Sequence, residues 1–326
     1  MAIRRKVRAS VATIGIVLVS LAATASAQSA YPSKPIRLIL PYAPGGSTSV
    51  VGRLVGQKLI ESMKHQVFVD NRPGGNTIIG SEALVKSPPD GYTLLLVTST
   101  HTINASLLKT PYDAVKDFTP VSTLTRGPFL LVVHPSLPVK NLREFVSLAK
   151  SRPGQLDYAS SGTGTSNHLA SELFSIVAGI RMHHIPYKGG GPALTDLMGG
   201  QVQVHINVPV VLISNVKSGR IKGLAVSGEA RLPALPEVPT FIEGGFPAFN
   251  MTNWNGILAP AGTPKAIVDK LNAEIGKALQ MPDIREKMTA QGLEAWASTP
   301  EQFAAQIRSD IDTFAKVVKA ANIKAE

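Results

Sequence analysis

The stretch "IRLILPYAPGGSTSVVGRLVGQKLIESMKHQVFVD" (residues 36–70) decides the fold of this chain. Its two ends, "IRLIL" (36–40) and "QVFVD" (66–70), are short apolar runs that predict buried strands. Between them, apolar residues at positions 51, 54, 55, 59 and 63 follow helical spacing and predict an amphipathic helix over 50–63. A strand, a helix and a strand at this spacing form the βαβ unit of a parallel sheet, so the sequence indicates an α/β protein.

The same alternation continues along the chain. Further strands are predicted at 93–97, 129–134, 181–187, 201–207, 222–227 and 253–260. Four further helices are predicted. One covers 141–151, and a second carries the apolar residues Leu169, Leu173, Ile176 and Val177. A third begins at Pro264, and the last, at the end of the chain, has Phe303, Ile307, Ile311, Phe314 and Val318 on one face. Because a chain of about 300 residues usually forms two cores, we predict two lobes, 28–126 together with 228–326, and 127–227. The two crossings between the lobes would form a hinge.

The first residues have the pattern of an export signal. "MAIRRKVRAS" is basic, "VATIGIVLVSLAATASA" is apolar, and the small residues Ala25-Ser26-Ala27 follow. This order predicts a secretory signal peptide over 1–27 with cleavage after Ala27, and hence a periplasmic protein. The alternative, a retained membrane anchor, is disfavoured because the apolar run is short for a span of ~20 residues.

Composition excludes several function classes. The leader contains four basic and no acidic residues, so removing it lowers the formal charge from +11 to +7. The remaining Lys and Arg are scattered without interleaved aromatic residues, which argues against a nucleic-acid partner. With zero cysteines there is no disulfide and no thiolate metal site. His183 and His184 are adjacent on a predicted strand and point to opposite faces, so we expect neither a metal nor a cofactor.

The loop after the first strand has the features of an anion site. "PYAPGGSTS" (41–49) carries two glycines that allow close backbone approach, and its Ser and Thr residues open a helix. The first N–H groups of a helix lack internal acceptors, and the helix dipole favours an anion there. The alternative is a tight turn that merely caps a helix. The candidate ligand-binding residues of this loop are Tyr42, Ala43, Gly45, Gly46, Ser47, Thr48 and Ser49.

A second loop of the same kind lies in the other predicted lobe. "SSGTGTSNHLASELF" (160–174) places a flexible turn and several good capping residues before an apolar helix. It begins like G-x-G-x-x-G but lacks the third glycine, so a dinucleotide site is disfavoured. His168 has no partner nucleophile, since the chain contains neither G-x-S-x-G nor cysteine, and no catalytic residue is predicted. The candidate ligand-binding residues here are Ser161, Gly162, Thr163, Gly164, Thr165, Ser166 and His168.

Three more segments bear on the site. "VTSTHTIN" (97–104) follows a strand and directs Thr98, Ser99 and Thr100 toward the same crevice, of which Thr98 and Ser99 are candidate ligand-binding residues. "IPYKGGGPALTDLMGG" (185–200) is another junction of strand, glycine turn and helix, with Tyr187 as a candidate. Asn207, which closes the predicted strand 201–207, is the last candidate. "VDNRPGGNTIIG" (69–80) is also glycine-rich, and we interpret it as a structural loop.

Taken in order, these segments resemble a known family. "YPSKPIRLILPYAPGG", "YASSGTGTSNHLASELF", "IPYKGGGPALTDLMGGQV" and "NWNGILAPAGTP" are similar to the substrate-binding proteins of tripartite tricarboxylate transporters, the Bug (TctC-like) family. The resemblance implies a non-catalytic periplasmic receptor with the two-lobed type II, Venus-flytrap fold. It implies a carboxylate ligand, such as a dicarboxylate, a tricarboxylate or an aromatic acid, and a membrane permease as partner. It also implies that the loops 42–49 and 161–168 line the cleft.

Two departures and two alternatives remain. The family usually has Asp where this chain has Ser49 and Gln203, which bears on ligand preference. A receptor that feeds a sensor kinase, or an exported enzyme acting on an anionic substrate, are the alternatives to a transport receptor.

Overall fold

The computed structural model describes residues 31–320 and 323, and the account below concerns the compact unit that begins at Lys34. The predicted βαβ unit is confirmed by β1 (Ile36–Leu40), α2 (Ser47–Met63) and β2 (Val67–Asn71). β1 pairs in parallel with β2 and with β3 (Thr93–Thr98). α2 begins three residues before the predicted position because Gly46, whose backbone is extended, is its N-cap residue. The predicted export signal, 1–27, lies outside the described residues.

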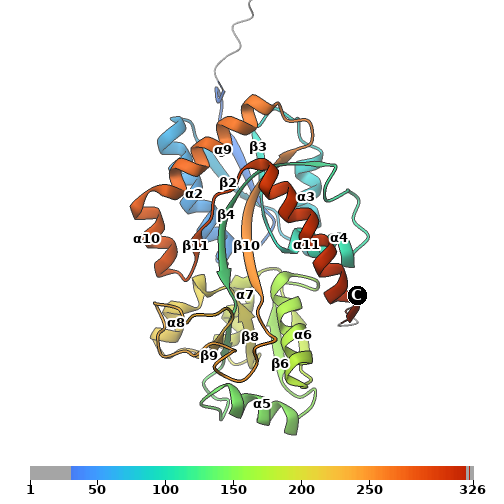
Figure 1. The fold of residues 1–326 in the computed structure, drawn as a ribbon, viewed down its shortest axis with the longest axis vertical. Coiled ribbons are helices and arrows are strands. Elements are labelled where there is room, and N and C mark those ends of the chain that lie inside the picture. The colour runs from blue at the N-terminus through green and yellow to red at the C-terminus, as the bar shows by residue number, and fades with distance from the viewer. Residues whose placement is uncertain (1–30, 321–322, 324–326) are drawn as a thin grey trace, which may run out of the picture. The chain divides into compact units, whose positions relative to one another are not determined.

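The first sheet has the strand order β11-β4-β10-β3-β1-β2 (Figure 1). β10 (Thr252–Pro260) runs antiparallel to both β3 and β4 (Phe118–Pro128), and β11 (Glu294–Ala295) completes the edge. Its helices are α2, α3 (Ile78–Val85), α4 (Thr100–Leu107), α9 (Lys265–Gln280), α10 (Pro282–Ala290) and α11 (Pro300–Ala320). β4 was not predicted from the sequence, because "FTPVSTLTRGP" is rich in Ser and Thr that become buried only in the folded sheet.

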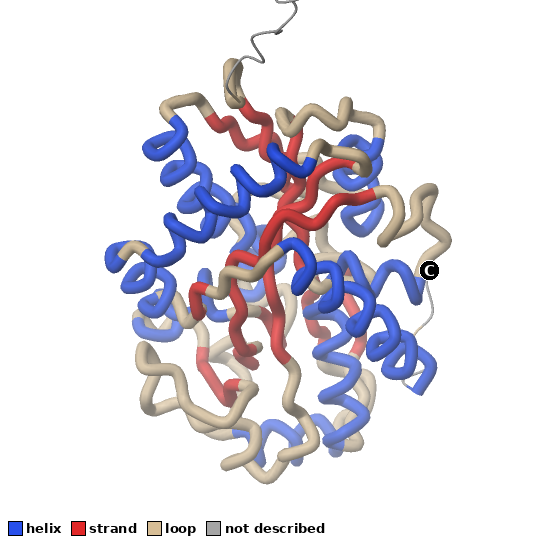
Figure 2. The backbone as a smooth tube through the Cα atoms, turned by 45° about the horizontal axis from the view of Figure 1, so that its top comes forward, coloured by secondary structure: helices blue, strands red, loops and turns tan. Residues whose placement is uncertain are grey.

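The second sheet has the order β7-β6-β8-β5-β9, and its strands confirm the predictions between 129 and 227. Figure 2 shows the strands in the middle of the molecule, with helices around them. The strands of the second sheet are β5 (Leu130–Val133), β6 (Asp157–Ser160), β7 (His183–Pro186), β8 (Val204–Asn207) and β9 (Lys222–Val226). The accompanying helices are α5 (Leu142–Ser151), α6 (Ser166–Ala178), α7 (Gly190–Met198) and α8 (Ile213–Lys217), with the short 3-10 turn η3 (Pro209–Val211). Another 3-10 turn, η2 (Gly75–Thr77), lies beside the first sheet, between β2 and α3.

The chain passes from the first sheet to the second between β4 and β5, and returns between β9 and β10. Each sheet has its own buried apolar clusters, so the chain has the two-lobed fold. On α6 the fully buried face carries Leu169 and Phe174, whereas Ile176, which was predicted to face the core, is 51% exposed. None of the described helices is both long enough and apolar enough to span a membrane.

The C-terminal helix α11 packs on both lobes, which its apolar pattern alone did not predict. Phe303 and Ile307, near its start, pack into the core beside the first sheet. Val318, near its end, belongs to the core beside the second sheet, together with Phe174 and Phe241. The lobes are therefore connected by this helix as well as by the two strand crossings.

Candidate ligand-binding site

Four helices begin around one cavity between the two sheets. α2 and α4 follow strands of the first sheet, and α6 and α7 follow strands of the second. Parallel strands of an α/β sheet open their carboxyl ends toward a ligand crevice, and each of these helices starts just beyond such an end. The cavity, called the first cavity below, has about 40 Å³ of space open to the centres of water molecules. It is lined by Tyr42, Gly46, Ser47, Thr48, Thr98, Thr100, Ser161, Thr165, Ser166, Asn167, Gly190, Asn207, Val208, Asn253 and Asn255.

The wall of the first cavity is polar but carries no charged side chain. Its residues carry hydroxyl or amide side chains or are glycines, with Val208 as the one aliphatic side chain. The Tyr42 hydroxyl lies 3.0 Å from the Thr98 hydroxyl, and burial raises the pKa of this phenol above its ordinary value. The phenol is therefore neutral and able to donate a hydrogen bond.

Several backbone N–H groups at the helix starts have no acceptor among the described residues. The helix geometry explains this, because the first N–H groups of any helix point away from its own carbonyls. In α2, the N–H groups of Ser49 and Val50 donate to the Gly46 carbonyl, so the N–H groups of the two residues before them have no acceptor. The N–H groups without an acceptor belong to Ser47, Thr48, Asn167, His168, Gly190 and Gly191.

Two side chains in the first turn of α2 are also unsatisfied. Ser47 is 9% exposed and Ser49 is 4% exposed, and neither hydroxyl oxygen has a hydrogen-bond partner within the described part of the chain. A buried polar group without a partner costs about 1–3 kcal/mol. Ser47 lines the first cavity, so an oxygen-rich ligand bound there would satisfy its hydroxyl.

The two lobes touch directly around the cavity. The Ala43 N–H donates to the Lys188 carbonyl at 3.1 Å, and the Ser166 N–H donates to the Thr100 hydroxyl at 3.1 Å. A Cβ placed on Gly46 would lie 3.6 Å from the Gly190 backbone. The glycine loops on opposite lobes therefore meet backbone to backbone, which corresponds to a closed cleft.

His168 lies behind the wall of the cavity. Its Nδ1 accepts the Gly164 N–H at 2.9 Å, and its ring stacks on His184 with 4.0 Å between centroids. Burial lowers the pKa of His168 to about 4 and that of His184 to about 3, so both rings are neutral at pH 7. His168 thus positions the loop before α6.

The adjacent histidines 183 and 184 point in different directions, as expected. His183 pairs with the Asp157 carboxylate at 2.8 Å on the surface, whereas His184 bonds to the Ser160 hydroxyl at 2.6 Å. Within residues 31–320 and 323, no group of three or more His, Cys, Asp or Glu could hold a metal ion.

The predicted site residues fall into three groups. The first cavity contains Tyr42, Gly46, Ser47, Thr48, Thr98, Ser161, Thr165, Ser166 and Asn207. A neighbouring cavity contains Gly162 and Tyr187. The candidates that line neither cavity are Ala43, Gly45, Ser49, Ser99, Thr163, Gly164 and His168. Ser99 holds a lining residue in place, because its hydroxyl donates to Asn253 Oδ1 at 2.7 Å.

Several lining residues were not among the sequence candidates. Asn253 and Asn255 project from β10, which returns to the first sheet after the second lobe is complete. No local pattern marks them, since their strand reads as an ordinary buried run. Gly190 could have been found from the glycine turn at 189–191, and Asn167 from its place beside the capping residues.

The two departures from the family pattern occupy different places. Ser49 lies in the first turn of α2, next to the cavity wall. Gln203 lies just before β8, where its side chain accepts the Asp157 N–H at 2.9 Å and thus aligns the amino ends of β6 and β8. The cavity is at the opposite, carboxyl ends of these strands, so Gln203 takes no part in it.

A wider groove of about 600 Å³ lies beside the strand crossings. It is lined by 126–128, by 227–230 with Glu229, by Arg285 and Thr289 of α10, and by the segment around β11. It is open and mixed in charge, and none of the four helix starts described above contributes to it. The first cavity is therefore the better candidate for the principal site.

Comparison with known proteins agrees with this architecture. Residues 51–323 match the profile of a family described as the tripartite tricarboxylate transporter family receptor. The chain is 39% identical to Protein BugT of Bordetella pertussis over 319 residues, covering 96% of this chain and 97% of BugT.

Solved structures are similar in fold as well. The Rhodopseudomonas palustris protein Rpa4515 with adipate superimposes with a TM-score of 0.88 at 33% identity, over 90% of this chain and 99% of that one. MatC from the same organism, with bound malate, gives a TM-score of 0.84 at 30% identity, over 88% and 100% of the two chains. The fold and the cleft define a periplasmic binding protein. The chain belongs to the tripartite tricarboxylate transporter receptor family, the TctC or Bug family.

Proposed function

We propose that this protein captures a small carboxylate in the first cavity and delivers it to a membrane permease of the tripartite tricarboxylate type. The observation that carries the proposal is the meeting of helix starts from both lobes around one cavity without charged side chains. Unpaired N–H groups and positive helix ends there favour an anion. The unsatisfied Ser47 hydroxyl is an independent indication of a polar ligand.

The binding free energy that these contacts can supply is adequate for a receptor. A hydrogen bond to a charged group contributes about 1.5–3 kcal/mol, and a helix terminus adds about 0.3–1 kcal/mol. Three or four such contacts approach the ~8 kcal/mol of a micromolar complex. Two related structures, one with adipate and one with bound malate, support a carboxylate as the ligand class.

The proposed cycle depends on movement of the lobes. We propose that 28–126 with 228–326 and 127–227 act as the two lobes, and that a ligand stabilises the closed arrangement by bridging both. Closure would then be the signal that the permease recognises. We propose further that residues 1–27 act as an export signal cleaved after Ala27, which would direct the receptor to the periplasm.

The test is a thermal-shift and calorimetric screen of mono-, di- and tricarboxylic and aromatic acids, each beside its neutral amide. We expect at least one acid to raise the melting temperature by several degrees while its amide has no effect. Ser47→Ala should weaken that acid about tenfold without lowering the stability of the free protein, and the exposed Ser309→Ala serves as the matched control. Stabilisation by sugars or cations alone, with every acid silent, would refute the proposal. Appearance of a reaction product would instead support an enzyme.

A further inference from the structure

A cavity between the cores of the two lobes lies apart from the candidate site. It has about 240 Å³ of space open to the centres of water molecules and shares no lining residue with the first cavity. On one side is Trp254, which belongs to the core beside the first sheet. On the other are Leu173, Phe314 and Val317, which pack against the core beside the second sheet. This space, called the inter-core cavity below, is therefore bordered by both cores.

One carboxylate lies in the wall of the inter-core cavity. Among the described residues that line it, Asp310 of α11 is the only charged one. Its Oδ2 accepts the Trp254 Nε1–H at 2.7 Å, and its Oδ1 accepts a hydrogen bond from Gln306 Nε2 at 2.7 Å. Because both donors also line the cavity, the carboxylate itself lies at the cavity wall. A carboxylate has about four lone-pair sites, so each oxygen of Asp310 can accept a further hydrogen bond.

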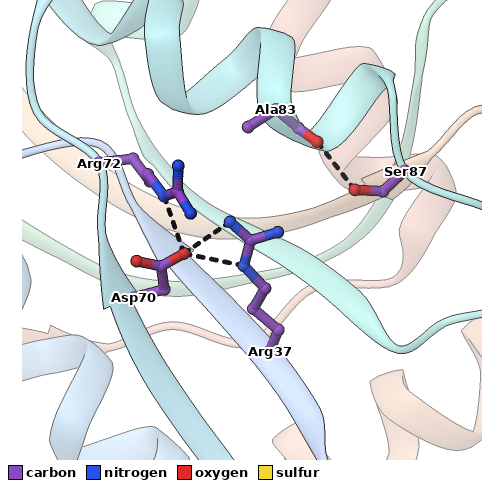
Figure 3. Close-up of polar contacts among 5 residues, drawn as sticks. All are labelled: Arg37, Asp70, Arg72, Ala83 and Ser87. Atoms are coloured by element: carbon purple, nitrogen blue, oxygen red, sulfur yellow. Dashed lines mark hydrogen bonds and ion pairs between the residues drawn. The ribbon is translucent and has the colours of Figure 1, made fainter.

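This carboxylate has no cationic partner within the part of the chain that the structure describes. Its two hydrogen bonds come from neutral groups, and no Lys, Arg or His nitrogen lies at ion-pair distance from it. Asp70, another half-buried carboxylate, is compensated, because Arg37 Nε donates to it at 2.8 Å and Arg72 Nε at 3.0 Å (Figure 3). Asp310 is thus partly removed from water without a compensating charge.

The pKa values of the two carboxyl groups shift in opposite directions for this reason. Burial acts to raise the pKa of Asp70, but the hydrogen bonds from Arg37 and Arg72 outweigh it and hold that pKa below its ordinary value. Burial raises the pKa of Asp310, and the hydrogen bonds from its two neutral partners offset this only in part. An opposite charge nearby favours the ionised form of a carboxyl group. A cation in the cavity would therefore stabilise the Asp310 carboxylate.

The rest of the wall determines which cation fits. Leu173, Met251, Phe314 and Val317 supply apolar and aromatic surface, which favours a hydrocarbon group, and aromatic rings also attract cations. A single carboxylate matches one ammonium group rather than a polyamine. No described cationic side chain lines the cavity, so the carboxylate of an amino acid would have no charged partner there. The matching ligand is a monoamine with a short hydrocarbon body.

We propose that the inter-core cavity binds a small organic ammonium ion. Its N–H groups would donate to the Asp310 carboxylate, and its hydrocarbon part would contact Leu173 and Phe314. This site takes a ligand opposite in charge to that of the first cavity. The proposal does not depend on the carboxylate-receptor function, because the two cavities have no lining residue in common.

The test is calorimetry of the full chain with straight-chain amines from propylamine to hexylamine, each beside the alcohol of the same length. We expect at least one amine to bind roughly tenfold more tightly than its alcohol. Asp310→Asn, which keeps the shape of the side chain but removes its charge, should abolish this difference. Asp312→Asn, a matched loss of charge at an exposed position of the same helix, should leave the difference unchanged.

A second variant tests the cavity without altering the carboxylate. Thr313 is exposed and lines the cavity, so a larger side chain there can enter the space without replacing a core residue. Thr313→Phe should weaken the best amine roughly tenfold by occupying part of the cavity, while its melting temperature stays close to that of the wild type. This variant decides the question if Asp310→Asn does not fold.

The outcomes separate this site from the proposed receptor function. Equal binding of amines and alcohols, or a preference for amines that survives Asp310→Asn, would overturn the ammonium site. Amine binding that is unaffected by Thr313→Phe would also overturn it. Loss of the preference in Asp310→Asn, with unchanged binding of the best acid of the carboxylate screen, would support it. Failure of every acid in that screen would refute the receptor function and leave the ammonium site intact.

Discussion

Substituting Gly191 by alanine should hinder closure of the lobes without lowering the free energy of unfolding. Gly191 lies in the first turn of α7, and a Cβ added there would be 2.7 Å from the Pro44 carbonyl oxygen and 3.2 Å from the Gly45 carbonyl carbon. Real Cβ atoms do not approach backbone so closely, and Pro44 and Gly45 belong to the other lobe. The clash therefore exists only when the lobes are closed.

The size of the effect follows from the geometry. The loops must separate by several tenths of an ångström, and forcing an extra methyl group into packed atoms costs about 1–3 kcal/mol. Ligand binding, which requires closure, should therefore weaken about 5- to 150-fold. The free, open protein has no such clash, and alanine is favoured over glycine in a helix by up to about 1 kcal/mol. Its free energy of unfolding should be unchanged or slightly higher.

Calorimetry with the best acid of the screen would measure the affinity, and small-angle scattering with and without that acid would measure closure. Gly276→Ala in α9 is the matched control, since a Cβ there meets nothing within 4 Å. It should show the helix stabilisation without any loss of affinity. If Gly191→Ala binds and closes like the wild type, the glycine loops do not meet across the cleft and the reasoning from the closed geometry is wrong.

Two further predictions concern the folded lobes. His205 is fully buried, its Nδ1 faces the Ala159 carbonyl at 2.9 Å, and burial lowers its pKa to about 4. In the unfolded chain this histidine binds its proton near pH 6.5, so the free energy of unfolding falls as the pH drops from there toward 4, by about 2 kcal/mol at pH 5 for this group. Urea unfolding should show that loss between pH 7 and pH 5 in the wild type and a smaller loss in His205→Gln. An equal loss in both proteins would contradict this prediction. Gly256→Ala should cost about 1–3 kcal/mol, because the new Cβ would be 2.3 Å from the Phe303 ring. Adding Phe303→Leu should recover part of that loss in a double-mutant cycle, and strict additivity would argue against the contact.

Local sequence was sufficient to predict those strands and helix starts whose residue pattern agrees with their burial in the folded protein. The runs 36–40 and 93–97 became β1 and β3 because an unbroken apolar run is buried on both faces of a covered parallel sheet. The glycine and hydroxyl residues of 45–49 and 162–166 marked helix starts because turn and capping preferences act over a few residues. β4 escaped notice because the burial of its Ser122, Thr123 and Thr125 depends on distant neighbours.

The sequence by itself determined that the chain folds as α/β lobes and that two loops expose helix amides, since strand burial, helix periodicity and capping are short-range effects. Only the tertiary structure decided that β10 brings Asn253 and Asn255 to the same cavity, and that α11 packs on both lobes. The physical reason is that a cleft is formed by groups from separate segments whose approach depends on the packing of both sheets. The sequence around these residues contains no local pattern that indicates which distant segments they will meet.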